Sequence, residues 1–110
     1  MLITAVVPTR NRPQDLGRAV ASGCAQARAP DELLIIDQSP DDASRQHIEA
    51  LLKTTGTEIT VDYVHDPQIA GLVAAKKAAV SRAHGDLVCF LEDDVVLEPE
   101  DIRVGSVNED

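Results

Sequence analysis

Aromatic residues are scarce in this sequence, whose 110 residues include no tryptophan, one phenylalanine and one tyrosine. Hydrophobic residues make up 44% of the chain, so the core must be built from valine, isoleucine, leucine and alanine. This composition favours helices that pack on parallel strands. The length allows one domain at most, so we treat residues 1–110 as a single domain.

Basic residues are also scarce. Ten lysines and arginines stand against 19 aspartates and glutamates, which gives a net charge of -9. Nucleic acids and anionic membranes bind surfaces rich in lysine and arginine, so this balance argues against nucleic acid as a partner. An anionic ligand would need local help from a metal ion or from a few well-placed cations.

The two cysteines, Cys24 and Cys89, lack the spacing of metal ligands, so we expect them to be reduced thiols in the core. No run approaches the ~18 apolar residues of a membrane span, and the first residues lack the basic start of a signal peptide. We therefore expect a cytoplasmic protein, with peripheral association at the inner membrane face as an open alternative. Glycine-rich dinucleotide and P-loop motifs are absent from the sequence.

The first segment of the chain has the pattern of a strand followed by a helix. Residues 2–7 form an apolar run, which we expect Pro8 to end because proline cannot donate to a sheet. Asn11 is then a candidate N-cap. Apolar residues follow at helical spacing from Leu16 to Ala27, so one face of this helix is expected to lie on a sheet.

The next segments repeat this alternation. A second apolar strand covers 33–36 and ends at Asp37. Ser39 is expected to cap a second helix that has proline and acidic residues in its first turn and a buried stripe within 48–52. Residues 58–64 alternate between polar and apolar, which predicts an edge strand with one wet face.

The last patterned segment contains a third helix and a fourth strand. The helix is expected to begin near Gly71 and to end before Gly85, which is well placed as the residue after the C-cap. Apolar residues at helical spacing are expected to face the sheet: Leu72, Ala75, Ala79, Val80 and Ala83. The strand from Leu87 to Leu91 is apolar on both faces, and 99–110 have no strong pattern.

Together these segments predict an α/β fold, a Rossmann-like parallel sheet flanked by helices with right-handed crossovers. The edge character of 58–64 and the two-sided burial of the other strands favour the strand order 3-2-1-4. In such sheets ligands bind outside the carboxyl ends of the strands where the order reverses, here between the first and fourth strands.

Polar residues follow every strand at that edge: Thr9, Arg10, Asn11, Arg12, Asp37, Gln38, His65, Asp66, Glu92, Asp93 and Asp94. Each one alone is readily explained by loop solubility, and Asp37 alone is more typical of a turn residue. Their expected convergence on one rim makes them a candidate site.

Glu92, Asp93 and Asp94 are three consecutive carboxylates directly after an apolar strand. Their mutual repulsion calls for a cation, and a cluster of oxygen ligands suits a hard divalent ion such as Mg²⁺ or Mn²⁺. Taken alone, an acidic cap for a helix within 98–102 explains the cluster equally well.

Four segments, in order, resemble the family 2 glycosyltransferases, which have the nucleotide-sugar-binding GT-A fold. Residues 6–13 (VVPTRNRP) resemble the opening signature, and 33–39 (LLIIDQS) resemble the second strand with its terminal acid. Residues 69–79 (IAGLVAAKKAA) are similar to the Gly-Leu-Ala-x-Ala-Arg-Asn segment, and 90–94 (FLEDD) to the strand that leads into the metal-binding Asp-x-Asp motif. The resemblance covers residues 1–98.

The resemblance implies the N-terminal, nucleotide-sugar-binding half of such an enzyme. It assigns the nucleotide site to Pro8, Thr9, Arg10, Arg12, Asp37, Lys76, Glu92 and Asp93. Asp37 would bond to the base, and Asp94 would hold Mn²⁺ or Mg²⁺, with Glu92 as a second candidate ligand. The implied activity is metal-dependent, inverting transfer of a sugar to an unknown acceptor, of the kind that builds cell-envelope polysaccharide.

Three positions depart from the family pattern, because Gln38 replaces a common acid, Lys77 a common asparagine and Glu92 the first aspartate of the motif. The resemblance also places the acceptor site and the general base in a further half that this chain does not contain. We therefore expect a truncated or separately encoded donor half. Its uncovered strand edge, Leu87 to Leu91, is expected to favour homodimers, aggregation or pairing with the tail.

Two other readings remain open. The chain could be a catalytically inactive nucleotide-binding or interaction module that keeps this fold. A receiver-like phospho-acceptor domain also clusters acids at strand ends. That fold places an acid pair after its first strand, where this chain has Thr9, Arg10 and Asn11, so this reading is less favoured.

Overall fold

The computed structural model describes residues 1–26, 29–55 and 58–92. Strands and helices alternate along the chain: β1 (Ile3–Thr9), α1 (Pro13–Cys24), β2 (Glu32–Asp37), α2 (Ala43–Thr55), β3 (Thr60–His65), α3 (Gly71–Arg82) and β4 (Leu87–Phe90). All strand pairs are parallel, and the order is β3-β2-β1-β4. The predicted fold class and strand order are therefore confirmed.

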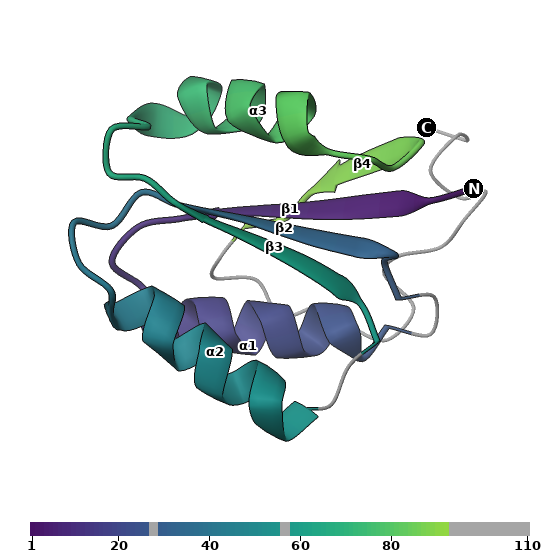
Figure 1. Ribbon diagram of the computed structural model, residues 1–110, viewed down its shortest axis with the longest axis horizontal. Coiled ribbons are helices and arrows are strands. Elements are labelled where there is room, and N and C mark those ends of the chain that lie inside the picture. Colours follow the sequence, from purple (N-terminus) through teal and green to yellow (C-terminus); the bar gives the residue numbers. More distant parts are fainter. Residues whose placement is uncertain (27–28, 56–57, 93–110) are drawn as a thin grey trace.

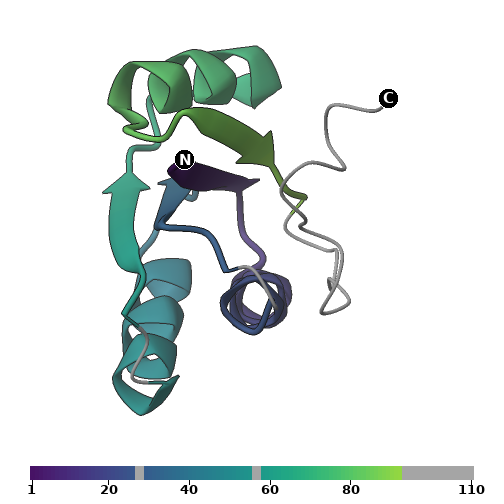
Figure 2. The ribbon, with the colours of Figure 1, turned by 90° about the vertical axis from the view of Figure 1, so that its right-hand side faces the viewer.

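The sheet lies between two helical layers. Figure 1 shows α1 and α2 on one face and α3 on the other, and Figure 2 shows the same layers from the side. Successive side chains of a strand point to opposite faces, so each layer has its own core. One is formed by Ala5, Val7, Leu16, Val20, Leu33, Ile35 and Ile48, and the other by Val6, Leu34, Ile36, Ala75 and Ala79.

Pro8 lies inside β1 and does not end it, which corrects the expectation from the sequence. The carbonyls of Ile3 and Thr9 accept hydrogen bonds from the β2 side, whereas the carbonyl of Val6 accepts one from Leu91 on the β4 side. By this alternation Pro8 faces β4, whose pairing with β1 stops at Val6. The strand tolerates proline because no ladder bond is needed there.

The expected N-caps of the first two helices were wrong. Arg12 is the N-cap residue of α1, without a side-chain cap bond, and Asn11 has a left-handed φ of 55°. The second helix begins at Ala43, four residues after Ser39, and no acid lies in its first turn. Asn11 and Ser39 instead bond to each other, because the backbone N–H of Asn11 donates to the Ser39 hydroxyl at 2.8 Å.

The third helix packs on the sheet through its alanines alone. Ala75 and Ala79 are buried, but Leu72 and Val80 are 59% and 65% exposed, so the expectation that they face the sheet was wrong. Gly85 is not the glycine after a C-cap, since Ala83 is the C-cap. Its role is close approach to β1, because a Cβ there would lie 2.7 Å from the backbone nitrogen of Thr4.

One edge of the sheet agrees with the sequence pattern, whereas β4, which was expected to be buried on both faces, is half-buried and its Phe90 is 41% exposed. β3 forms one edge, as its alternating residues predicted, and β4 pairs only with β1 in the part of the chain that the structure describes. Cys24 and Cys89 are free thiols, as expected, but both are partly buried and neither lies in the core. Burial raises the pKa of the Cys89 thiol. Among the described residues, no helix is both long enough and apolar enough to cross a bilayer.

Candidate functional site

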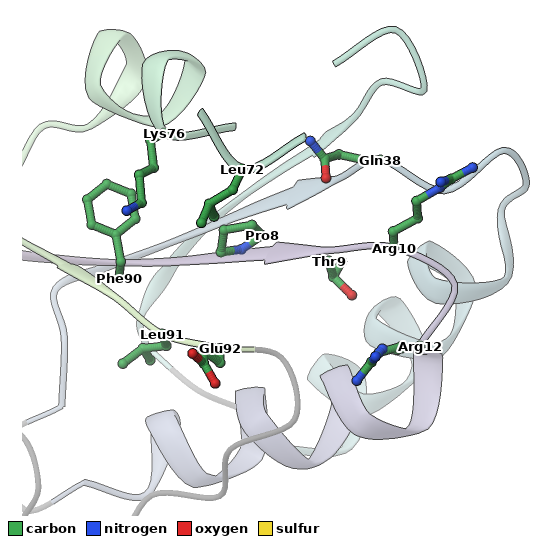
Figure 3. Close-up of a pocket in the computed structure, with 10 residues that line it drawn as sticks. All are labelled: Pro8, Thr9, Arg10, Arg12, Gln38, Leu72, Lys76, Phe90, Leu91 and Glu92. Atoms are coloured by element: carbon green, nitrogen blue, oxygen red, sulfur yellow. The ribbon is translucent and has the colours of Figure 1, made fainter. Parts of the chain in front are cut away.

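A cavity of about 650 Å³ lies at the carboxyl ends of β1 and β4 (Figure 3). This is where the strand order reverses, the usual position of ligand sites in open parallel sheets. The cavity is lined by Pro8, Thr9, Arg10, Arg12, Gln38, Leu72, Lys76, Phe90, Leu91 and Glu92.

The end of β1 and the turn after it supply one wall. Thr9 is 3% exposed, and its carbonyl accepts a hydrogen bond from the N–H of Gln38 at 2.9 Å. The chain then turns at Asn11, whose N–H donates to Ser39. Arg10 and Arg12 are the neighbours of Asn11 in the sequence, and both line the cavity.

Asp37 ends β2 opposite Thr9, its register partner on β1, and is 0% exposed. One carboxylate oxygen accepts a hydrogen bond from the N–H of Ser39 at 2.9 Å, and the other accepts one from the Tyr63 hydroxyl at 2.6 Å. Burial raises the pKa of Tyr63, and the hydrogen bond and negative charge of Asp37 raise it further. Asp37 is not among the residues that line the cavity.

The opposite wall comes from the N-terminal half of α3. The Gln38 side chain donates to the carbonyl of Gly71 at 2.9 Å, which ties the end of β2 to the start of α3. Gly71 has a φ of 87°, a conformation that favours glycine. Lys76 reaches from the helix to the Phe90 ring, with its Nζ 5.5 Å from the ring centroid (Figure 3). A cation at this distance from an aromatic ring is attracted to its face.

The charge of the cavity differs from that of the chain. Among the described residues, the charged side chains that line it are Arg10, Arg12 and Lys76, together with the carboxylate of Glu92. The protein as a whole carries a net charge of -9. The sequence therefore concentrates part of its small supply of cations at one concave site, where a ligand with negative charge would be attracted.

The structure thus brings together six residues of the expected nucleotide site, Pro8, Thr9, Arg10, Arg12, Lys76 and Glu92. Asp37 is the register partner of Thr9 on the neighbouring strand and does not line the cavity. Asp93 and Asp94 are outside the described residues. Within residues 1–26, 29–55 and 58–92, no three His, Cys, Asp or Glu side chains are grouped closely enough to hold a metal ion. His65 is at the same end of the sheet but bonds to the Ser39 carbonyl and does not line the cavity.

Sequence reasoning missed the apolar part of the lining, Leu72, Phe90 and Leu91. Leu72 has a helical position that suits a core residue, and Leu91 belongs to an apolar run. Phe90 is the only phenylalanine in the chain and lies next to the acidic residues. That combination was the one available signal for an aromatic residue at the site.

Solved glycosyltransferases share this fold. Mannosyltransferase PcManGT from Pyrobaculum calidifontis, in complex with GDP-Man and Mn²⁺, matches with a TM-score of 0.74 and 20% identity, over 84% of this chain and 27% of that one. Staphylococcus aureus TarS 1–349 in complex with UDP matches with a TM-score of 0.67 and 22% identity, over 91% of this chain and 29% of that one. At such identities the likeness establishes the fold alone.

The Mycobacterium tuberculosis glucosyl-3-phosphoglycerate synthase in complex with UDP is a further structural match, with a TM-score of 0.59 and 22% identity, over 86% of this chain and 34% of that one. This chain therefore spans about a third or less of each of these proteins, and its fold corresponds to the N-terminal part of the GT-A fold. The sequence model of Glycosyl transferase family 2 matches residues 4–104. The chain belongs to glycosyl transferase family 2.

Proposed function

We propose that this chain is the donor-binding part of a glycosyltransferase and that its cavity binds the diphosphate of a nucleotide sugar. The observation that carries the proposal is the cationic lining, Arg10, Arg12 and Lys76, in a chain of net charge -9. The position at the strand-order reversal supports the same conclusion.

The residues that line the cavity suit the parts of such a donor. Arginine presents a planar fork of N–H donors that can contact two phosphate oxygens at once, so Arg10 and Arg12 are proposed to bind the diphosphate. Lys76 supplies a compact positive charge from the opposite wall. Pro8 and Thr9 are proposed to contact the nucleoside, and Glu92 and Asp93 its ribose or the sugar.

A base contact by Asp37 stays a prediction. Its two oxygens already accept hydrogen bonds from Ser39 and Tyr63, although each carboxylate oxygen has a second acceptor site. The side chain is 0% exposed, so a base could reach it only if neighbouring residues moved.

A divalent ion fits the donor set at the end of β4. Glu92 brings one carboxylate to the cavity, and Asp93 and Asp94 follow it in sequence. Carboxylate oxygens are hard ligands suited to Mn²⁺ or Mg²⁺. We propose that Asp94 holds the ion with Glu92 as a second candidate, and the bound ion would act as a Lewis acid that stabilises the departing diphosphate. The arginines and Lys76 would share that charge from the other side.

The solved relatives support a nucleotide ligand. PcManGT was solved with GDP-Man and Mn²⁺, and TarS with UDP and with UDP-GlcNAc. Because this chain spans less than a third of those two proteins, the acceptor, the inverting course of transfer and a cytoplasmic location are proposals of the same kind. No general base is assigned in this chain.

Isothermal titration calorimetry tests this proposal with the purified chain, the donors UDP-GlcNAc and GDP-Man, and the products UDP and GDP, with and without Mn²⁺. We expect binding of at least one nucleotide that is strengthened by the ion. Arg12→Ala should weaken it by about fivefold, the effect of one exposed charge contact. The matched control is Arg82→Ala, because Arg82 is bonded to Asp62 and does not line the cavity. Absence of heat with every nucleotide would refute the proposal.

A second candidate function is a nucleotide-binding module without turnover. The observation that favours it is Glu92, which stands where the family pattern has the first aspartate of the metal-binding motif. Nucleotide binding without transfer or hydrolysis of the donor sugar would support this function. Either activity in the isolated chain would rule it out.

A further inference from the structure

A continuous set of hydrogen bonds joins β3 to the turn after β1, whose residues line the cavity. The Tyr63 hydroxyl donates to one oxygen of Asp37 at 2.6 Å, and the Ser39 N–H donates to the other at 2.9 Å. The Ser39 hydroxyl in turn accepts the N–H of Asn11 at 2.8 Å. His65 Nε2 lies 2.9 Å from the Ser39 carbonyl and fixes the same residue from β3.

The members of this set are placed behind the cavity wall and not in it. Asp37 and Ser39 are each 0% exposed, and neither they nor Tyr63 line the cavity. The last bond of the set reaches Asn11, whose neighbours on both sides, Arg10 and Arg12, do line it.

Asn11 is the residue in the turn that most needs an external partner. Its φ of 55° lies in the left-handed region, which non-glycine residues adopt only when their surroundings favour it. The bond from its N–H to Ser39 supplies such a constraint. Without it, the backbone between the two arginines would have more freedom, and the positions of their side chains at the cavity would be less fixed.

We propose that Asp37, Ser39 and Tyr63 are positioning residues that hold the Arg10–Arg12 turn ready for a diphosphate. The inference rests on the proposed function, since it explains how the diphosphate site of that function is ordered in advance. It gives Asp37 an indirect role, through Ser39, that does not depend on a contact with the base. Pre-ordering raises affinity because the entropy of fixing the turn is lost during folding and not during binding.

Two single-atom changes test the inference outside the cavity lining. Ser39→Ala removes the acceptor for Asn11, and Tyr63→Phe removes a donor to Asp37. The matched control is Ser22→Ala, which removes a partly buried hydroxyl that donates within α1. Circular dichroism establishes that each variant is folded, and NMR titrations measure affinity for UDP, GDP and their free nucleosides at low and high salt.

If the wild type binds UDP or GDP, Ser39→Ala and Tyr63→Phe should each lower affinity for that nucleotide by about three- to tenfold. The salt dependence should become weaker, because arginine–phosphate contacts produce it, and affinity for the free nucleoside should not change. Hydrogen exchange at the Asn11 amide should become faster in Ser39→Ala and not in Ser22→Ala. A merely structural role would change neither the ratio of nucleotide affinity to nucleoside affinity nor the salt dependence of nucleotide binding.

Two results would overturn the inference while leaving the proposed function intact. One is nucleotide affinity and Asn11 exchange in Ser39→Ala and Tyr63→Phe equal to those of the wild type. The other is an Asp37→Asn variant that loses affinity equally for nucleotide and nucleoside while Ser39→Ala loses none, as a direct base contact requires. A wild type that binds no nucleotide would overturn the proposed function and this inference together.

Discussion

Tyr63→Phe is the sharpest perturbation of the fold near the cavity, because it removes one oxygen from the only tyrosine of the chain. The hydroxyl donates to Asp37 at 2.6 Å, and Asp37 is 0% exposed. Hydrogen bonds to charged groups contribute about 1.5–3 kcal/mol, and Tyr63 is only half-buried, so we expect about 1.5 kcal/mol. In a domain of roughly 100 residues that loss lowers Tm by about 6–12 °C.

Thermal unfolding followed by circular dichroism measures this loss. The same change made in an Asp37→Asn background is the control, because the charged acceptor is then already gone. The loss there should be clearly smaller, as expected when two side chains interact directly. Equal unfolding temperatures for Tyr63→Phe and the wild type would refute the reasoning.

The same hydroxyl predicts a pH dependence. Burial raises the pKa of Tyr63 above its ordinary value of 10.0, and the bond to Asp37 raises it further. Because the folded pKa lies above the unfolded one, this stabilisation is complete below about pH 10 and is lost as the pH rises further. Phenolate absorbance should therefore appear together with the loss of far-ultraviolet circular dichroism. Reversible ionisation near pH 10 in the folded protein would contradict this assignment.

Three further predictions concern other parts of the molecule. Gly85→Ala should lower the free energy of unfolding by about 1–3 kcal/mol in urea titrations, because its Cβ would lie 2.7 Å from the Thr4 nitrogen; wild-type stability would contradict the tight approach. Arg10→Ala should weaken UDP or GDP binding by about fivefold, most strongly at low salt, in calorimetry; unchanged affinity would remove Arg10 from the site. Burial opposes ionisation of Glu32, but hydrogen bonds from His84 and Thr4 outweigh it and lower its pKa below 4.5. The free energy of unfolding of the wild type, measured in urea, should therefore fall as the pH drops below about 4.5, and that of Glu32→Gln should fall less. An equal fall with pH in both proteins would contradict this.

Much of the fold could be predicted from the sequence because the hydrophobic pattern directly reflects burial. Alternating residues in 58–64 identified an edge strand, and unbroken apolar runs identified β1 and β2 as central strands. The sequence did not predict Pro8 inside a strand, because the strand tolerates it only where β4 has stopped pairing. It also did not predict that Leu72 and Val80 are exposed, since a helical stripe does not state how much of it the sheet covers.

The candidate site was predictable in part for a similar reason. Parallel strands bring their carboxyl ends to one edge, so the meeting of Thr9, Arg12 and Glu92 follows from topology. The partners of Asp37 could not be read from the sequence, because its bond to Tyr63 joins residues 26 positions apart. Ser39 was taken for a helix cap on local pattern, whereas its hydroxyl accepts a bond from a residue 28 positions away.

The most direct test of the central claim is an NMR titration of the isotope-labelled chain with UDP and with GDP in the presence of Mg²⁺. If the cavity binds the diphosphate, the largest amide shifts will fall on Thr9, Arg10, Arg12 and Lys76. Amides at the opposite end of the sheet, such as those of Glu32 and His84, will stay unchanged. Shifts confined to that opposite end, or no shifts with either nucleotide, would contradict the claim.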